Sequence, residues 1–214
     1  MTTKRFWQDP YLVDLDTRVA SVDRPGITLE ETNFFAYSGG QESDRGTING
    51  FEVIEAKKVG TEIIYTLVEG HSFSVGDEVR VSIDWPRRYH LMRYHFAAEL
   101  VLELIYRTVP GIEKIGAHIS DDKARIDFVL ESNISPILGE ISNIANALVR
   151  ANLEIRSAFS DESTERRFWL IEGFSQVPCG GTHLRRTGEI GSIQLRRDNI
   201  GKGKERVVIT LNDG

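Results

Sequence analysis

The feature that most constrains this fold is the stretch from Asp84 to Glu99, where an alternating segment ends and a long helix is expected to begin. Pro86 suits the first turn of a helix, because its missing N–H would have no partner there. The helix is expected to run to about Thr108, before a Pro-Gly pair. His95 and Glu99 lie four residues apart in it, so an imidazole and a carboxylate share one helical face, one turn apart.

The chain before this helix is expected to form β structure. Residues 78–84 alternate apolar and polar side chains, and further strand-like segments at 26–32, 51–56 and 62–68 are separated by short turns. Several short strands with this punctuation favour a small barrel or a curled sheet. We therefore predict a small β-barrel-like domain over residues 1–86.

The chain after this helix mixes strands with a second helix. Ser135 is the expected N-cap and Pro136 the first helical residue. The predicted buried stripe of this helix consists of apolar residues at helical spacing: Ile137, Ile141, Ile144, Ala145 and Leu148. The expected strands cover residues 112–119, 124–130, 154–158, 167–171, 191–195 and 205–211. This order lacks a regular βαβ rhythm, so we predict the α+β class, with an antiparallel sheet and two main helices in a domain over residues 87–214.

A second pair of chemically active residues lies far downstream. Cys179 and His183 flank a Gly-Gly-Thr loop, and the glycine pair suits a tight turn that directs both side chains to one point. Cysteine, histidine and carboxylate all bind zinc, and a thiolate favours zinc over magnesium or calcium. We therefore predict that His95, Glu99, Cys179 and His183 meet around one zinc ion.

Glu99 interrupts an otherwise apolar face. Leu91, Ala98 and Leu102 share that face with His95, and a buried carboxylate is costly unless a cation, a metal or a proton accompanies it. The alternative is that Glu99 points toward solvent at the edge of the stripe.

The composition is that of an ordinary soluble protein, with 40% hydrophobic and 27% charged residues. The sequence contains no apolar run near the ~20 residues that cross a bilayer, and its first residues lack the apolar segment of a signal peptide. Its single cysteine is consistent with a reducing compartment. We expect a cytoplasmic protein without a membrane partner, and the sequence specifies no oligomeric state.

The charge distribution has one local exception to an acidic average. The net charge is −6, which disfavours indiscriminate binding of nucleic acid. Residues 185–206 nevertheless hold seven cations and three anions, a local balance of +4. Such a strip can hold a phosphate backbone at one place, although a solvated surface with salt bridges is an equal alternative. The candidate RNA-binding side chains in it are Arg185, Arg186, Arg196, Arg197, Lys202 and Lys204.

A glycine-containing segment, 32–41, is embedded in the expected β region. Its glycines let the backbone approach another group closely, and Gln41 beside them offers both hydrogen-bond donors and an acceptor. Taken alone, the segment is more simply a glycine turn between strands.

Together these motifs resemble the free-standing alanyl-tRNA editing proteins, relatives of the editing domain of alanyl-tRNA synthetase and more distantly of that of threonyl-tRNA synthetase. The resemblance covers nearly the whole chain. It rests on the glycine-rich motif at 32–41, Asp-Trp-x-Arg-Arg at 84–88, Pro-Cys-Gly-Gly-Thr-His at 178–183, Thr-Gly-Glu-Ile-Gly at 187–191 and Lys-Gly-Lys at 202–204. The chain departs from the family at Ala36 and Ser38, where proline and glycine are usual.

The most important departure is Glu99, which occupies the second histidine position of the metal helix. The first, third and fourth ligand positions carry over to His95, Cys179 and His183. As a ligand, Glu99 would give the metal site no net formal charge, against +1 with two helical histidines, and thereby weaken its Lewis acidity. Alternatively, Glu99 is a general base beside an open three-ligand site.

The resemblance implies an N-terminal glycine-rich β domain followed by an α+β editing core. It also implies hydrolysis of the ester that joins serine or glycine to the 3′ acceptor end of the alanine tRNA. A pocket sized for alanine cannot fully exclude these two amino acids, so a second hydrolytic site repairs the errors. We predict that Thr32 and Gln41 line that second pocket, where a polar group left unpaired would reject alanine.

Three other functions fit the same residues. One is a metal-dependent hydrolase of small esters, one is a non-catalytic tRNA-binding relative whose metal site is altered by Glu99, and one is an editing hydrolase for another misacylated tRNA. The basic strip favours RNA over small esters.

Overall fold

The computed structural model describes residues 2–23 and 26–212, and the chain divides into two compact units. The first unit contains the residues up to Ser38 and residues Glu42–Tyr89. The second contains Gly39–Gln41 and the residues from His90 onward. The glycine-rich segment is therefore shared between the units, since its last three residues belong to the second.

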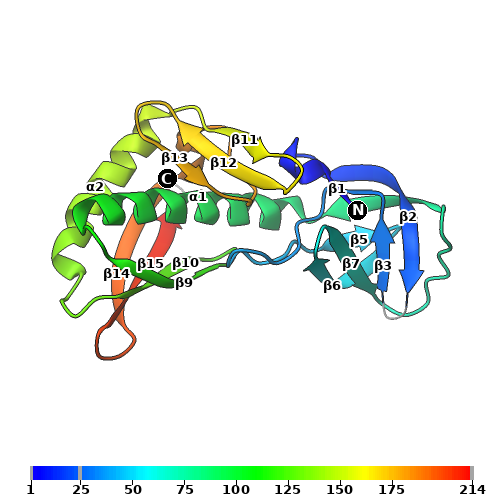
Figure 1. The fold of residues 1–214 in the computed structure, drawn as a ribbon, viewed down its shortest axis with the longest axis horizontal. Coiled ribbons are helices and arrows are strands. Elements are labelled where there is room, and N and C mark those ends of the chain that lie inside the picture. The colour runs from blue at the N-terminus through cyan, green and yellow to red at the C-terminus, as the bar shows by residue number, and fades with distance from the viewer. Residues whose placement is uncertain (1, 24–25, 213–214) are drawn as a thin grey trace. The chain divides into compact units, whose positions relative to one another are not determined.

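The first unit is built almost entirely of strands (Figure 1). Its elements are β1 (Thr3–Lys4), η1 (Arg5–Trp7), β2 (Asp14–Asp23), β3 (Gly26–Leu29), β4 (Glu31–Thr32), β5 (Gly46–Ile48), β6 (Phe51–Val59), β7 (Glu62–Leu67) and β8 (Glu78–Ile83). The strands pair in the order β2-β3-β7-β6-β5-β8, and β8 pairs back to β2, so the sheet closes into a barrel. Strand β1 pairs with β4 in a parallel arrangement outside this ring.

The alternating sequences of the strands decide what fills the barrel. In β8 the side chains of Val79, Val81 and Ile83 are buried, while their neighbours are more exposed. In β7 the same alternation buries Ile63 and Tyr65. Because successive side chains in a strand point to opposite faces, β7 and β8 each contribute every second residue to the apolar core.

Helix α1 (Trp85–Thr108) begins in the first unit and continues into the second. Its start is fixed by a fully buried ion pair between Arg88 and Asp44. Arg88 Nε donates to Asp44 Oδ1 at 2.8 Å, and its other nitrogens donate to the carbonyls of Asn33 and Pro10. The predicted domain boundary between residues 86 and 87 lies in the first turn of this helix, which runs on through it.

The second unit contains two antiparallel sheets. Its elements are β9 (Glu113–Ile119), β10 (Ala124–Val129), α2 (Ser135–Ala151), β11 (Arg156–Asp161), β12 (Arg166–Ile171), β13 (Ser175–Pro178), η2 (Thr187–Ile190), β14 (Ser192–Asn199) and β15 (Lys204–Asn212). The strand orders are β14-β15-β10-β9 and β11-β12-β13. Within the described residues, the predicted α+β class with antiparallel sheets and two main helices is confirmed.

Helix α1 is more deeply buried than the sequence predicted. We expected a single inward stripe, yet every residue from Leu91 to Ala98 is buried. Figure 1 shows the reason, since the part of α1 in the second unit runs between the two sheets of that unit. Because this part of the helix is covered on opposite sides, His95 is buried and only 17% of the Glu99 side chain is exposed.

Helix α2 corrects two details of the prediction. Its N-cap is Ile134, not Ser135, and the Ser135 N–H is bound by the side-chain oxygen of Asn133 at 2.9 Å. The buried stripe includes Leu138 with Ile141 and Ala145, whereas the predicted member Ile144 is 40% exposed. Neither α-helix of the described chain has the length and apolar character needed to cross a bilayer.

Candidate metal centre

The candidate centre is built around the sulfur of Cys179. His95 Nε2 lies 3.2 Å from Cys179 Sγ, and His183 Nε2 lies 3.3 Å from the same atom. The ligand atoms of these three residues all lie within 4.8 Å of one another. The structure therefore brings together three of the four side chains that the sequence predicted would meet.

The loop after β13 turns the cysteine and the second histidine toward α1. Gly181 is essential to this turn, because a Cβ atom there would lie 2.5 Å from His95 Cε1 and 2.6 Å from its Nε2. By contrast, a Cβ atom on Gly180 would meet nothing within 4 Å. Of the two glycines, only Gly181 must lack a side chain to make room for His95.

Glu99 lies beside this group rather than within it. Its Oε1 is 3.8 Å from Cys179 Sγ and 3.9 Å from His95 Nε2, but Glu99 is not part of the group whose ligand atoms all lie within 4.8 Å. Its other oxygen, Oε2, accepts a hydrogen bond from Trp169 Nε1 at 2.9 Å. The side chain is thus directed inward, and its role as ligand or base stays a prediction.

Burial sets the protonation of the three central side chains. It raises the pKa of the Cys179 thiol strongly, and the Glu99 carboxylate raises it further. It lowers the pKa of His95, and it lowers that of His183 well below the usual value, with His95 and Arg167 adding to the effect. At neutral pH the unliganded group is therefore a thiol and two neutral imidazoles.

This donor set suits a divalent cation. Cys179 Sγ faces His95 Nε2, His183 Nε2 and Glu99 Oε1 together, and its single S–H can donate to only one of these three atoms. A divalent cation bound here would be held by His95, His183 and the Cys179 thiolate, and the combination of cysteine and histidine is typical of zinc. Ser157 Oγ lies 2.7 Å from His183 Nδ1 and fixes the orientation of that ring.

Arg167 supplies a positive charge next to the cysteine. Its side chain is buried, and burial lowers its pKa to about 10, so it remains charged at neutral pH. Its guanidinium donates to the Gly181 carbonyl at 3.4 Å, and its own carbonyl accepts the Cys179 N–H at 2.9 Å. The same strand face, which alternates with the exposed one, also carries Trp169.

Gln41 reaches this loop from the glycine-rich segment. It is fully buried, pairs with Ile119 of β9 through an isolated bridge, and donates from Nε2 to Thr182 Oγ1 at 3.0 Å. Its Oε1 has no hydrogen-bond partner among the described residues and would lie 3.2 Å from a Cβ atom on Gly181. Gln41 thus presents an acceptor beside the candidate centre.

Thr32 lies in the first unit and is fully buried. Its Oγ1 lies 2.6 Å from Tyr65 Oη, which donates to it, and it also accepts the Phe34 N–H at 3.0 Å. These contacts anchor the start of the glycine-rich segment inside the barrel. The predicted role of Thr32 in lining a substrate pocket stays a prediction.

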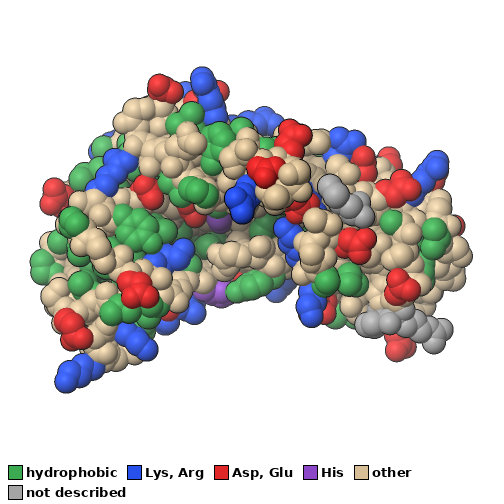
Figure 2. All heavy atoms as spheres, viewed as in Figure 1, with side chains coloured by type: hydrophobic (Ala, Val, Ile, Leu, Met, Phe, Trp, Pro, Cys, Tyr) green, Lys and Arg blue, Asp and Glu red, His purple; other side chains and the backbone are tan. Residues whose placement is uncertain are grey.

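The six basic candidates for RNA binding fall on two parts of the second unit. Arg185 and Arg186 precede η2, and the others belong to the hairpin of β14 and β15: Arg196, Arg197, Lys202 and Lys204. Arg197 is paired with Glu205. Figure 2 shows basic and acidic side chains interspersed on the face of this unit that it draws. The RNA-binding role of the strip stays a prediction.

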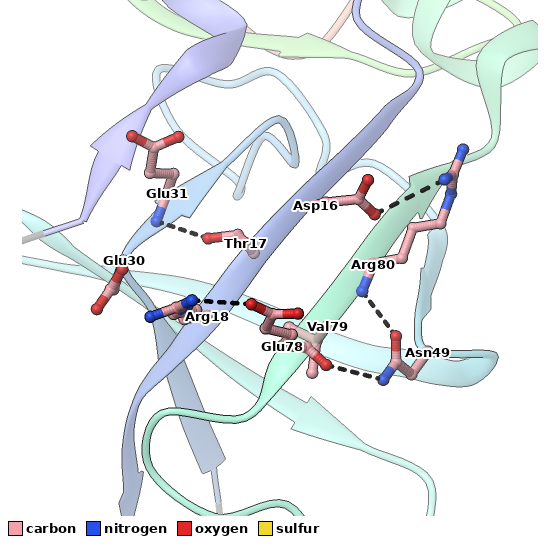
Figure 3. A pocket seen from close by; sticks show the side chains of 9 residues that line it. All are labelled: Asp16, Thr17, Arg18, Glu30, Glu31, Asn49, Glu78, Val79 and Arg80. Atoms are coloured by element: carbon pink, nitrogen blue, oxygen red, sulfur yellow. Dashed lines mark hydrogen bonds and ion pairs between the residues drawn. The ribbon is translucent and has the colours of Figure 1, made fainter.

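A separate hollow of about 530 Å³ lies on the first unit (Figure 3). Its cations face acids of the same hollow, since Arg18 lies 2.8 Å from Glu78 and Arg80 lies 3.7 Å from Asp16. These pairs are largely exposed, and the hollow contains none of the predicted site residues. With four acids and two cations, the hollow is an exposed acidic surface whose two arginines are already paired.

Sequence reasoning did not single out the residues that support the centre. Ser157 and Trp169 contact His183 and Glu99 from strands far away in the chain. Sequence spacing does not predict these contacts, because it is the pairing of β11, β12 and β13 that brings Ser157 and Trp169 to the site. Arg167 could have been suspected, since a charged residue two positions before a tryptophan in an alternating strand shares its face.

Two protein-family models match this chain, one in each half of it. The description "Threonyl and Alanyl tRNA synthetase second additional domain" matches residues 169–208, and "tRNA synthetases class II (A)" matches residues 11–87. The alanyl-tRNA editing protein AlaX-M of Pyrococcus horikoshii is 37% identical over 216 residues, which cover 99% of this chain and 98% of that protein. This chain belongs to the alanyl-tRNA editing protein family.

Other relatives support this assignment. The AlaX-M protein of Methanosarcina acetivorans is 33% identical over 246 residues, with full coverage of both chains. The alanine–tRNA ligase of Korarchaeum cryptofilum is 34% identical over 216 residues, which cover 90% of this chain but only 24% of the ligase. The chain therefore corresponds to one segment of the much longer ligase and to the whole of its free-standing relatives.

Proposed function

We propose that this protein hydrolyses the ester of misacylated tRNA, releasing serine or glycine from the acceptor end of the alanine tRNA, at a zinc centre held by His95, Cys179 and His183. The observation that carries the proposal is the convergence of these three ligand atoms in a member of the alanyl-tRNA editing family. We assign the first unit as the glycine-rich β domain, the second as the editing domain, and the cytoplasm as the place of action.

The residues around the centre have distinct roles in this proposal. When bound, zinc supplies the Lewis acidity that ester hydrolysis needs. Glu99 Oε1 faces the centre and acts there either as a fourth donor or as the base for water. Arg167 adds a positive charge beside Cys179, which offsets the negative charge that Glu99 brings where the family has histidine.

Discrimination of serine from alanine requires a polar group that the serine hydroxyl satisfies. Gln41 is our candidate, because its buried Oε1 has no partner in the described structure and is therefore available to accept a hydrogen bond from the serine hydroxyl. Thr32 is the second candidate that we retain from the sequence. The basic side chains of residues 185–204 are the proposed contacts to the tRNA backbone.

The decisive experiment is hydrolysis of purified seryl-, glycyl- and alanyl-tRNA by the protein, with and without a chelator, with zinc content measured on the same preparation. We expect loss of serine or glycine, retention of alanine, and inhibition by chelation. Equal inertness toward all three substrates would favour a tRNA-binding protein without activity. Cleavage of a free seryl ester at the same rate would favour a small-ester hydrolase.

A further inference from the structure

Glu99 uses its two carboxylate oxygens differently. Oε2 accepts the hydrogen bond from Trp169 Nε1 at 2.9 Å, while Oε1 lies within 4 Å of both Cys179 Sγ and His95 Nε2. A glutamate side chain has several rotatable bonds, so its position on a helix does not by itself determine where each carboxylate oxygen points. A separate group must hold it, and the indole N–H is that group.

Trp169 is itself held rigidly. It is fully buried, its ring meets Phe96 edge to face at 5.2 Å between centroids, and it stacks on Phe174 with an interplanar angle of 13°. Contacts from two sides fix the direction of its N–H. Because that donor is buried, leaving it without an acceptor would be costly, so the indole and the carboxylate constrain each other.

The bond from Trp169 also limits what Glu99 can offer to the centre. With Oε2 engaged, only Oε1 faces the group, and a divalent ion there would meet one carboxylate oxygen rather than two. Carboxylate ligands are commonly oriented by such outer contacts, whose loss weakens metal binding by about 10- to 100-fold.

We propose that Trp169 is a positioning residue that holds Glu99 by one oxygen and turns the other toward the His95–Cys179–His183 group, so that Glu99 acts on a bound divalent cation through a single oxygen. This inference rests on the proposed function, in which that group holds a metal. Trp169 touches neither the substrate nor the metal and acts only through Glu99.

The test measures metal binding by the apoprotein and needs no tRNA. Cobalt(II) is titrated into the metal-free protein in competition with a chelator, and the visible absorption of bound cobalt is recorded. Trp169→Phe removes the N–H but keeps an aromatic ring against Phe96 and Phe174. We expect cobalt affinity to fall about tenfold and the cobalt bands to shift. The matched control, Trp85→Phe, removes an indole of the first unit and should change neither.

A double-mutant cycle separates positioning from simple packing. In a Glu99→Ala background, Trp169→Phe should cause no further loss of affinity, because its effect passes through the carboxylate. An equal loss in both backgrounds, or wild-type affinity and spectrum in Trp169→Phe, would overturn the proposal. If the wild-type protein binds no cobalt, both this inference and the metal centre are wrong. If it binds cobalt and hydrolyses seryl-tRNA while Trp169→Phe has no effect, only the inference fails.

Discussion

The two units each bury a cluster of polar side chains, but they satisfy its hydrogen bonds in opposite ways. In the first unit, the ion pair of Arg88 and Asp44 is 0% exposed on both sides. Every nitrogen of the guanidinium donates a hydrogen bond, and Asp44 Oδ2 also accepts the Phe35 N–H at 2.7 Å. This pair is complete without any added group.

The second unit leaves its buried group incomplete. Two imidazoles face one thiol, and His95 Nδ1 and Gln41 Oε1 have no hydrogen-bond partner among the described residues. Because unsatisfied buried groups cost free energy, such a group is retained when something outside the chain completes it. We therefore expect the Arg88–Asp44 pair to serve folding and the His95–Cys179–His183 group to serve binding.

Breaking the complete cluster should have the largest effect on stability. Arg88→Met leaves Asp44 buried without its cation, and we expect the free energy of unfolding to fall by about 3–5 kcal/mol. Urea denaturation followed by circular dichroism measures it. Arg80→Met, which removes an exposed partner of Asp14, is the control and should cost less than about 1 kcal/mol. A loss no larger than the control's would show that the pair is not needed for folding.

Breaking the incomplete cluster should abolish function and spare the fold. Cys179→Ala removes the sulfur that both imidazoles face, and we expect seryl-tRNA hydrolysis to fall by more than about 100-fold. The free energy of unfolding of the apoprotein should change by only about 1 kcal/mol. Retained hydrolysis together with lost zinc would contradict a catalytic metal.

The free energy of unfolding should depend on pH through the two buried imidazoles of the second unit. Burial lowers the pKa of His95 and His183 below the unfolded value of about 6.5, so below that pH the unfolded chain binds protons that the folded chain excludes. The contribution is complete above about pH 6.5 and is lost toward the lowered folded pKa, with a slope of up to about 1.4 kcal/mol per pH unit for each imidazole.

Urea denaturation of the apoprotein at pH values between about 7.5 and 5.5 measures this slope, because this range brackets the histidine pKa of the unfolded chain. His183→Gln should reduce the slope, whereas Arg80→Met, which breaks an exposed ion pair, should leave it unchanged. Identical slopes in the wild type and in His183→Gln would show that the ring titrates alike in both states.

The smallest effect sharpens the geometry of the loop. Gly181→Ala puts a methyl group 2.5 Å from the His95 ring, and we expect it to weaken zinc binding by about tenfold by displacing that ligand. Gly180→Ala is the matched control, since its methyl group meets nothing within 4 Å. Competition with a fluorescent zinc chelator measures both. Equal affinities in the two variants would mean that His95 moves without consequence.

Local patterns predicted most of the fold. Strands β7 and β8 were predicted from their alternating side chains, and the start of α1 was predicted from its proline. These signals depend on neighbouring residues alone. The N-cap at Ile134 was missed because Asn133, which precedes the helix, accepts the Ser135 N–H with its side-chain oxygen, and Ser135 is then the first helical residue. The continuous burial of α1 from Leu91 to Ala98 was missed because it depends on two sheets formed later in the chain.

The candidate site followed the same division. His95, Cys179 and His183 could be found because helical spacing and a glycine loop mark them locally. The position of Glu99 could not, since it is set by Trp169 across the structure. The free acceptor of Gln41 was likewise invisible, because it depends on which of its atoms Thr182 engages.

The division of the glycine-rich segment limits how this protein can be cut or recombined. Gly40 fits against the Ala117 carbonyl only because it has no side chain, and its own carbonyl accepts the Ile119 N–H at 2.8 Å. A gene fragment that begins at His90 would therefore lose Gln41 and leave this edge of β9 and the hydroxyl of Thr182 without their neighbours. A single cut in the chain therefore cannot separate the two units, because Gly39–Gln41 lie within the sequence of the first unit. A shorter form of the protein would need another segment in place of these three residues.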